Sequence, residues 1–143
     1  MAAEERPVRT ILLVEDNELN LMVAEGMLGL LGLTADVARN GVQAVDAVLS
    51  ARYETVLMDI HMPEMDGFEA TRRIRAAVSV EIQPYIIALT ANAMVGDRKR
   101  CLDAGMDDYL SKPLTKDGLA AAMQRSRQRR VDQGAAEPDW RGG

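Results

Sequence analysis

The run Thr55-Val56-Leu57-Met58, followed directly by Asp59, indicates the fold class of this chain. Its side chains are mostly apolar and show no alternation with charged residues. This pattern is typical of a strand that is buried on both faces of a parallel sheet. Four further runs predict strands, two of them continuous and two weaker: Ile11-Leu12-Leu13-Val14, Tyr85-Ile86-Ile87-Ala88-Leu89, residues 34–38 and residues 108–111.

Segments with helical periodicity separate the predicted strands. They cover residues 19–31, 41–51, 67–77, 94–104 and 115–130. Gly32 and Gly105 stand where helices commonly stop, and Asn40 is a good N-cap. Two inward stripes are expected, one of Leu21, Ala24, Leu28 and Leu31 and one of Val42, Ala44, Val45 and Val48. Strands that alternate with helices predict right-handed crossovers and a doubly wound α/β sheet.

The composition limits the kind of protein this can be. The chain has 143 residues, of which 48% are hydrophobic and 3% aromatic, which suits one globular domain. No stretch of about 18 apolar residues predicts a membrane span, and the acidic N-terminus is not expected to be a secretory signal. The single Cys101 cannot form an internal disulfide, so a reducing, cytoplasmic location is expected.

The charge pattern argues against nucleic-acid binding. Seventeen basic and twenty-two acidic side chains give a formal net charge of −5. One basic run is present, made of Arg125, Arg127, Arg129 and Arg130. A solvated helix end explains this run, because cations are favoured near a helix C-terminus.

Three regions are predicted along the chain. Residues 1–8 are expected to be a flexible N-terminus and residues 9–130 one folded domain. Periodicity is lost over residues 131–143, which predicts a disordered tail or a linker. No room is left for a second folded output domain.

Five polar side chains stand at the ends of predicted strands. Glu15 and Asp16 follow the first strand, Asp59 the third, Thr90 the fourth, and Lys112 the fifth. Because the carboxyl ends of parallel strands meet at one edge of a sheet, these side chains are expected to converge there. Ligands of open α/β sheets bind at this edge, so we expect a functional site.

The chemistry of these five residues indicates phosphoryl transfer. Three carboxylates in one place repel one another, and a divalent cation relieves that repulsion. Oxygen ligands favour Mg²⁺ over a transition metal. Lys112 can offset the remaining charge and Thr90 can donate a hydrogen bond, while a carboxylate serves as nucleophile. Glu15 and Asp16 could instead cap the first helix, because acids are favoured at helix N-termini.

Four motifs in sequence order resemble those of response-regulator receiver domains of two-component signalling, over residues 8–130. They are Val14-Glu15-Asp16-Asn17, Met58-Asp59-Ile60-His61-Met62-Pro63-Glu64-Met65-Asp66-Gly67, Leu89-Thr90-Ala91 and Lys112-Pro113. The resemblance implies a flavodoxin-like (βα)5 three-layer sandwich with a five-stranded parallel sheet in the order 2-1-3-4-5. The combined match is specific, although each motif alone is weak.

The resemblance also implies the role of each residue. Asp59 matches the phosphoacceptor, with Asp16 as a direct Mg²⁺ ligand, Glu15 as a ligand through water, and the His61 backbone carbonyl as a further ligand. Thr90 and Lys112 match the residues that hold the phosphoryl oxygens.

Further positions follow from the same resemblance. The backbones of Ile60 and Ala91 are expected to contact the phosphoryl group. Tyr109 matches an aromatic switch that turns inward when Thr90 moves, while the positions of His61 and Asn92 tune the lifetime of the phosphate. The bond between Lys112 and Pro113 is expected to be cis.

The implied function is a Mg²⁺-dependent phosphoacceptor that takes its phosphoryl group from a histidine kinase or a histidine phosphotransfer protein. The face formed by the fourth helix, fifth strand and fifth helix would then signal to a downstream protein. Such a domain is not an enzyme in its own right, although it assists its own phosphorylation and dephosphorylation. Either a stand-alone regulator or the receiver piece of a hybrid histidine kinase fits, because motifs such as Glu15-Asp16-Asn17 with Asn20 are similar to those of hybrid kinases.

Three alternatives share parts of the pattern. A pseudo-receiver would bind partners without chemistry, but it usually lacks an acidic or lysine position that is filled here. A phosphatase with an aspartyl nucleophile would carry its motif after the first strand and would need a cap. A nucleotide-binding flavodoxin-like protein would need a glycine-rich loop where Glu15-Asp16-Asn17 stands.

Overall fold

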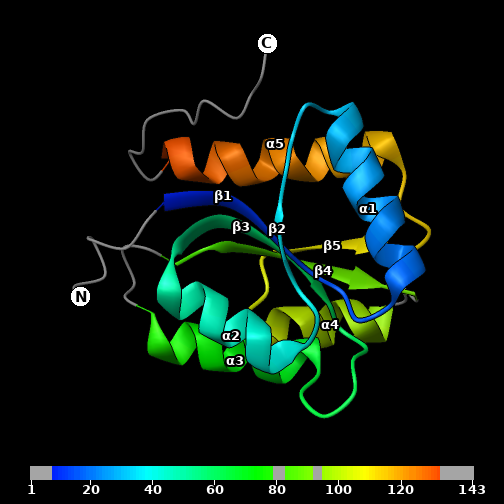
Figure 1. Ribbon diagram of the computed structural model, residues 1–143. Coiled ribbons are helices and arrows are strands. Elements are labelled where there is room, and N and C mark those ends of the chain that lie inside the picture. The colour runs from blue at the N-terminus through cyan, green and yellow to red at the C-terminus, as the bar shows by residue number, and fades with distance from the viewer. Residues whose placement is uncertain (1–7, 79–82, 92–94, 133–143) are drawn as a thin grey trace.

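The computed structural model describes residues 8–78, 83–91 and 95–132 (Figure 1). Its strands are β1 (Val8–Val14), β2 (Asp36–Ala38), β3 (Arg52–Asp59), β4 (Tyr85–Thr90) and β5 (Asp108–Ser111). Its helices are α1 (Glu18–Leu30), α2 (Gly41–Ser50), α3 (Gly67–Ala77), α4 (Val95–Ala104) and α5 (Lys116–Asp132). Strand and helix alternate along the chain, as the sequence predicts.

The five strands form one parallel sheet in the order β2-β1-β3-β4-β5, which confirms the predicted topology. Val14 at the end of β1 lies opposite Met58, and Asp59 at the end of β3 lies opposite Leu89. Thr90 at the end of β4 lies opposite Ser111. This register brings the carboxyl ends of the strands to one edge of the sheet.

Two helical layers cover the sheet (Figure 1). Helices α1 and α5 lie on one face, and α2, α3 and α4 lie on the other. Successive strand residues point to opposite faces, so two cores form. The core under α2, α3 and α4 includes Val14, Val56, Met58, Ile74, Ile86 and Cys101. The core under α1 and α5 includes Leu13, Leu28, Leu57, Ile87 and Leu119.

Local signals in the sequence explain where the helices begin and end. The side chain of Asn40 accepts a hydrogen bond from the Gln43 N–H group and caps α2, as predicted. Gly32 has φ = 77°, and the Leu33 N–H group beyond it donates back to the Leu28 carbonyl over 2.8 Å. This Schellman turn satisfies the carbonyl groups at the end of α1.

Some predicted details are wrong. Val42 does not face inward; 48% of it is exposed, because the buried stripe of α2 runs through Gly41, Ala44 and Val48. Leu31 is only partly buried, since α1 ends at Leu30 and residue 31 is its C-cap. β2 begins at Asp36 rather than at Thr34. Short edge strands have one neighbour, so their ends are weakly defined by sequence.

The ordered elements extend slightly beyond the predicted domain limits. β1 begins at Val8 and α5 continues to Asp132. The remaining parts of the predicted N-terminus and tail, residues 1–7 and 133–143, lie outside the described residues. Over the described ranges, none of the helices combines the length and apolar character needed to cross a bilayer.

Candidate functional site

Three carboxylates meet at the carboxyl edge of the sheet. Asp59 is the last residue of β3, and Glu15 and Asp16 directly follow β1. One ligand oxygen from each lies within 4.8 Å of the other two. Glu15 and Asp59 are both 2% exposed, whereas Asp16 is exposed to solvent. The predicted convergence of these three residues is therefore present, and one side of the cluster is open to water.

Lys112 lies between the two buried carboxylates. Its Nζ atom is 3.1 Å from Oε2 of Glu15 and 3.3 Å from Oδ1 of Asp59. The lysine follows β5, and its backbone N–H group donates to the Thr90 carbonyl over 2.7 Å. The peptide bond between Lys112 and Pro113 is cis, which confirms that prediction. One ammonium group thus offsets part of the negative charge of the cluster.

Burial dominates the electrostatics of Asp59. The pKa of this carboxyl group is raised from 3.8 to about 6, mainly because the group is removed from water and also because the Glu15 carboxyl lies nearby. The His61 N–H group, which donates to Oδ1 of Asp59 over 3.1 Å, and the Lys112 ammonium both lower this pKa. At neutral pH Asp59 is mostly ionised, but its charge is only partly compensated by the protein.

The turn after β3 positions Asp59 through a close backbone approach. A Cβ atom at Gly67 would lie 2.5 Å from the Asp59 carbonyl oxygen and 2.8 Å from the Ile60 Cα atom, so only glycine fits. The Gly67 N–H group donates to the Ile60 carbonyl over 3.2 Å. Asp66 caps α3 by accepting from the Glu69 N–H group. The sequence Asp66-Gly67 therefore folds the chain tightly against the end of β3.

The acidic pair after β1 does not cap the first helix. Asn17 is the N-cap of α1, and its side chain accepts a hydrogen bond from the Asn20 N–H group over 2.9 Å. Glu15 instead accepts from the Lys112 ammonium and, at 3.3 Å, from the Asn17 N–H group. The alternative reading of Glu15 and Asp16 as helix caps is wrong.

The donor set suits a hard divalent cation. All three side chains offer oxygen, two are buried, and the exposed Asp16 leaves room for water ligands. Few protein ligands with several waters are typical of Mg²⁺ sites. A cation would also offset the burial and the repulsion from Glu15, which together raise the pKa of Asp59.

The remaining predicted residues are placed as follows. Thr90 ends β4 and is 1% exposed, and Ala91, directly after it, is exposed. Tyr109 on β5 is partly buried against the core under α2, α3 and α4, with the Arg98 guanidinium 5.5 Å from its ring centre. Asn92 lies outside the described residues.

One predicted backbone contact needs correction. The Ile60 N–H group donates to the Leu89 carbonyl of β4 over 3.2 Å, so it is not free to contact a phosphoryl group. The His61 N–H group points to the Asp59 carboxylate instead. The sequence does not predict this donor. The last hydrogen bond between β3 and β4 decides which N–H group after β3 remains available to a ligand.

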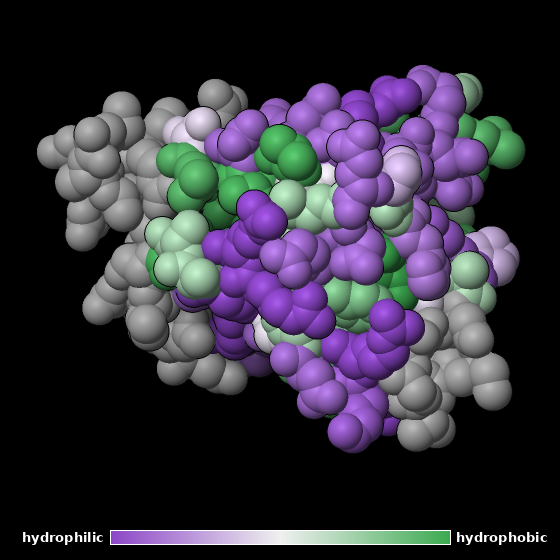
Figure 2. Space-filling model, turned by 90° about the horizontal axis from the view of Figure 1, so that it is seen from below, coloured by the Kyte–Doolittle hydropathy of each residue, from purple (hydrophilic) through white to green (hydrophobic). Residues whose placement is uncertain are grey.

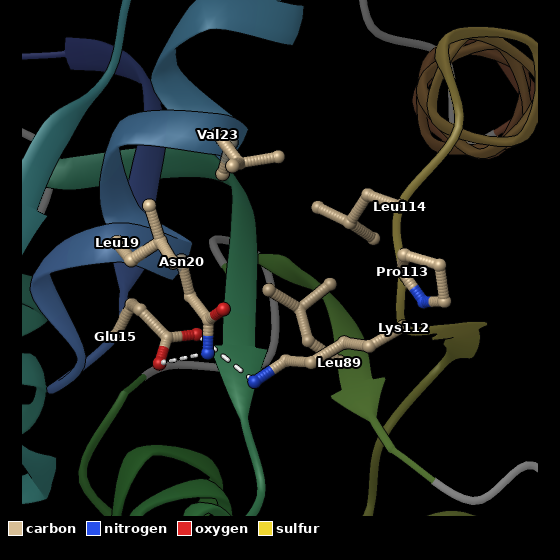
Figure 3. A pocket seen from close by; sticks show the side chains of 9 residues that line it. Glu15, Leu19, Asn20, Val23, Leu89, Lys112, Pro113 and Leu114 are labelled. Atoms are coloured by element: carbon tan, nitrogen blue, oxygen red, sulfur yellow. Dashed lines mark hydrogen bonds and ion pairs between the residues drawn. The ribbon is translucent and has the colours of Figure 1, made fainter.

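A groove lies beside the carboxylates, between α1 and the segment that follows β5 (Figure 3). It has a volume of about 140 Å³. Its apolar walls come from Leu19 and Val23 of α1, Leu89 of β4, and Leu114. Glu15, Asn20 and Lys112 form its polar end, so the groove opens directly onto the carboxylate cluster.

Two arginines of the basic run near the C-terminus form ion pairs at the amino end of β5, away from the carboxylate cluster. Arg125 contacts Asp108 over 2.6 Å, and Arg129 lies 3.5 Å from Asp107. Both pairs hold α5 against the beginning of β5.

Residues 11–124 match the family of the response regulator receiver domain. The match covers most of the 143 residues, and the fold and the placement of the acidic cluster agree with it. This chain belongs to the response-regulator receiver family and is a receiver domain of two-component signalling.

One similar protein of known structure is the receiver domain of a kinase. The chain is 49% identical to the receiver domain of a sensor histidine kinase from Pseudomonas aeruginosa PAO1, with a TM-score of 0.74. That match covers 82% of this chain and 95% of the other, which was crystallised with a magnesium ion in its active site cleft.

Full-length relatives are much longer than this chain. It is 41% identical over 119 residues to the aerobic respiration control sensor protein ArcB of Escherichia coli K12 and 40% identical over 139 residues to histidine kinase 5 of Arabidopsis thaliana. These matches cover 83% and 80% of this chain but only 15% of either relative.

Proposed function

We propose that this receiver takes a phosphoryl group from a phosphohistidine onto Asp59 in a Mg²⁺-dependent reaction. The observation that carries the proposal is the position of Lys112, whose Nζ atom lies within 3.3 Å of carboxylate oxygens of both Asp59 and Glu15. A single cation beside a buried nucleophilic carboxylate suits phosphoryl transfer, in which positioning and charge neutralisation supply most of the catalysis.

The reaction exchanges one bond to phosphorus for another. An oxygen of ionised Asp59 attacks the phosphorus, the P–N bond to the donor histidine breaks, and the imidazole leaves with the electron pair of that bond. Glu15, Asp16, Asp59 and the His61 carbonyl would hold Mg²⁺, which would supply charge stabilisation at the phosphoryl oxygens. Lys112 neutralises a further oxygen, and its ammonium is already in place before the reaction.

Hydrogen-bond donors complete the site. The hydroxyl group of Thr90 and the backbone N–H groups of Ala91 and His61 are proposed to hold the phosphoryl oxygens. The exposed His61 side chain and Asn92 would tune how long the aspartyl phosphate survives. Movement of Thr90 toward the phosphate would let Tyr109 turn inward and shift the face made by α4, β5 and α5.

The groove beside the site supports a protein donor. When a phosphohistidine reaches Asp59, the surface of the donor protein around that histidine covers the same edge of the sheet. Leu19 and Val23, which are 67% and 43% exposed, present apolar side chains there without a covering element. We expect the helix that carries the phosphohistidine to place an apolar side chain in this groove.

The cellular setting is proposed from the relatives. Similar receivers occur in histidine kinases, so this chain, with the residues that follow α5 as a linker, fits the receiver piece of a hybrid kinase. A stand-alone response regulator is the second kind of protein that this chain fits. In both, we propose a cytoplasmic receiver that signals to a protein effector, binds no nucleic acid directly, and is not an enzyme beyond assisting its own phosphorylation.

A mass measurement tests the proposal. Intact protein is incubated with acetyl phosphate, with Mg²⁺ or with EDTA, and compared with Asp59→Asn. A gain of one phosphoryl group that requires both Mg²⁺ and Asp59 is expected. A folded protein that gains no mass would instead be a pseudo-receiver that acts by binding alone.

A further inference from the structure

The C-terminal end of α4 is held by a single side chain from α3. The Nε group of Arg75 donates to the Gly105 carbonyl over 2.8 Å, just beyond the last residue of α4. Its Nη1 group donates to the Pro84 carbonyl, also over 2.8 Å, and its Nη2 group to Oδ2 of Asp107 over 2.7 Å. Arg75 therefore connects the end of α4 to the beginnings of β4 and β5.

Asp107 extends this connection into the sheet and to α5. Its Oδ2 atom also accepts from the Ile86 N–H group, and its own N–H group donates to the Ile86 carbonyl, both over 2.8 Å. Its Oδ1 atom lies 3.5 Å from Nη1 of Arg129. The side chains of Arg75 and Asp107 are 22% and 24% exposed, so solvent screens this ion pair less than a surface pair.

Backbone hydrogen bonds also satisfy carbonyl groups at this end of α4. Gly105 has φ = 101°, and the Met106 N–H group donates to the Cys101 carbonyl over 3.0 Å, which completes a Schellman turn. Cys101 and Ala104 are 1% and 4% exposed. The C-terminal half of α4 is thus both packed into the core and hydrogen-bonded to its neighbours.

The preceding turn of α4 is held differently. Arg98, Lys99 and Arg100 are exposed, and hydrophilic side chains cover most of the helical layer that contains α4 (Figure 2). The Arg98 guanidinium lies 5.5 Å from the centre of the Tyr109 ring, and Lys99 pairs with Asp103 within the helix. The Arg100 guanidinium lies 4.5 Å from the centre of the Phe68 ring of α3. Such exposed contacts are weak compared with hydrogen bonds to a shielded guanidinium.

We propose that Arg75 anchors the C-terminal end of α4, so that phosphorylation of Asp59 moves only the N-terminal half of this helix. The inference rests on the proposed function, because it concerns how the phosphorylated state is displayed. The N-terminal half moves relative to the anchored end at Gly105, and the contact between Arg98 and Tyr109 changes while the contacts of Arg75 persist. A partner that distinguishes the two states therefore does so near Arg98 and Tyr109.

Amide hydrogen exchange with residue resolution tests this proposal. The full chain is compared with and without beryllofluoride and Mg²⁺, which together mimic the aspartyl phosphate. Exchange at residues 98–100 is expected to change about threefold or more, while exchange at residues 102–107 stays within about twofold. Equal changes over both segments would overturn the proposal.

Two matched variants test the role of Arg75 itself. Arg75→Met should raise exchange at residues 102–107 about tenfold already in the resting protein and should let this segment respond to beryllofluoride. Arg72→Met on the same helix is the control, because Arg72 is exposed and, within the part of the chain that the structure describes, pairs only with Glu69 at 3.4 Å. If Arg75→Met folds and its exchange at residues 102–107 is unchanged, the proposal that Arg75 anchors α4 is overturned.

If Arg75→Met does not fold, Asp107→Asn replaces it, since asparagine can still accept from Ile86 but loses the charge that Arg75 contacts. A smaller rise confined to residues 102–107 is then expected, and no rise would again overturn the anchor. Failure of the proposed function looks different. In that case acetyl phosphate adds no mass and beryllofluoride changes exchange nowhere, while Arg75→Met still loosens the end of α4.

Discussion

The Nζ atom of Lys112 donates a hydrogen bond to Oε2 of Glu15 over 3.1 Å, although 97 residues separate the two along the chain. The same ammonium lies 3.3 Å from Asp59. One lysine, in the loop after β5, therefore connects the loop after β1 with the end of β3. The charge balance of the site depends on this bridge.

Asp59→Asn is expected to stabilise the protein in EDTA at pH 8. Because the pKa of Asp59 is about 6 in the folded protein and 3.8 ordinarily, the folded state binds more protons between these values. Wild-type stability therefore falls as the pH rises through this window, by on the order of 1 to 3 kcal/mol. Thermal melts from pH 4 to pH 8 should show an advantage of the variant that is largest at pH 8. An advantage independent of pH would contradict this explanation.

Lys112→Ala should fold but accept a phosphoryl group from acetyl phosphate about a hundredfold more slowly. The substitution removes the cation that faces the transferred group, while the three carboxylates that suit Mg²⁺ remain. Lys116→Ala, at the exposed start of α5, is the matched control and should react at the wild-type rate. Equal rates in both variants would show that the ammonium has no part in the reaction.

Gly67→Ala and Gly26→Ala should change stability in opposite directions. A methyl group at position 67 would press against the Asp59 carbonyl at 2.5 Å, which should cost about 1 to 3 kcal/mol. Gly26 lies in α1 with nothing within 4 Å of an added Cβ atom, so alanine there should add about 0.5 to 1 kcal/mol. Urea unfolding measures both. If Gly67→Ala leaves the free energy of unfolding unchanged, the turn after β3 can widen without an energetic cost.

Val23→Gln should slow transfer from a histidine phosphotransfer protein without affecting acetyl phosphate. Val23 lines the groove beside the site, and a protein donor is expected to cover it, whereas a small donor is not. Leu30→Gln, at the other end of α1 and 70% exposed, should leave both rates unchanged. A loss of about tenfold is expected for the protein donor, which corresponds to an apolar contact of about 1.4 kcal/mol. Equal slowing with both donors would place the defect in the chemistry instead.

Much of the site could be predicted because its members have fixed positions relative to strand ends. Glu15, Asp59 and Lys112 each follow a recognisable apolar run, and the carboxyl ends of parallel strands share an edge. Details that depend on the exact ladder of hydrogen bonds were predicted less well. Ile60 was expected to face the phosphoryl group, but its N–H group donates to Leu89.

The sequence by itself determined the alternation of strand and helix, the caps at Asn40 and Gly32, and the set of residues at the active edge, because these follow from local periodicity and backbone preferences. Only the tertiary structure decided which groups are shielded from water. The pKa of Asp59 rises because neighbours from several elements bury it. The contacts of Arg75 with Gly105 and Asp107 likewise depend on how α3 packs beside α4 and β5, which no local pattern in the sequence records.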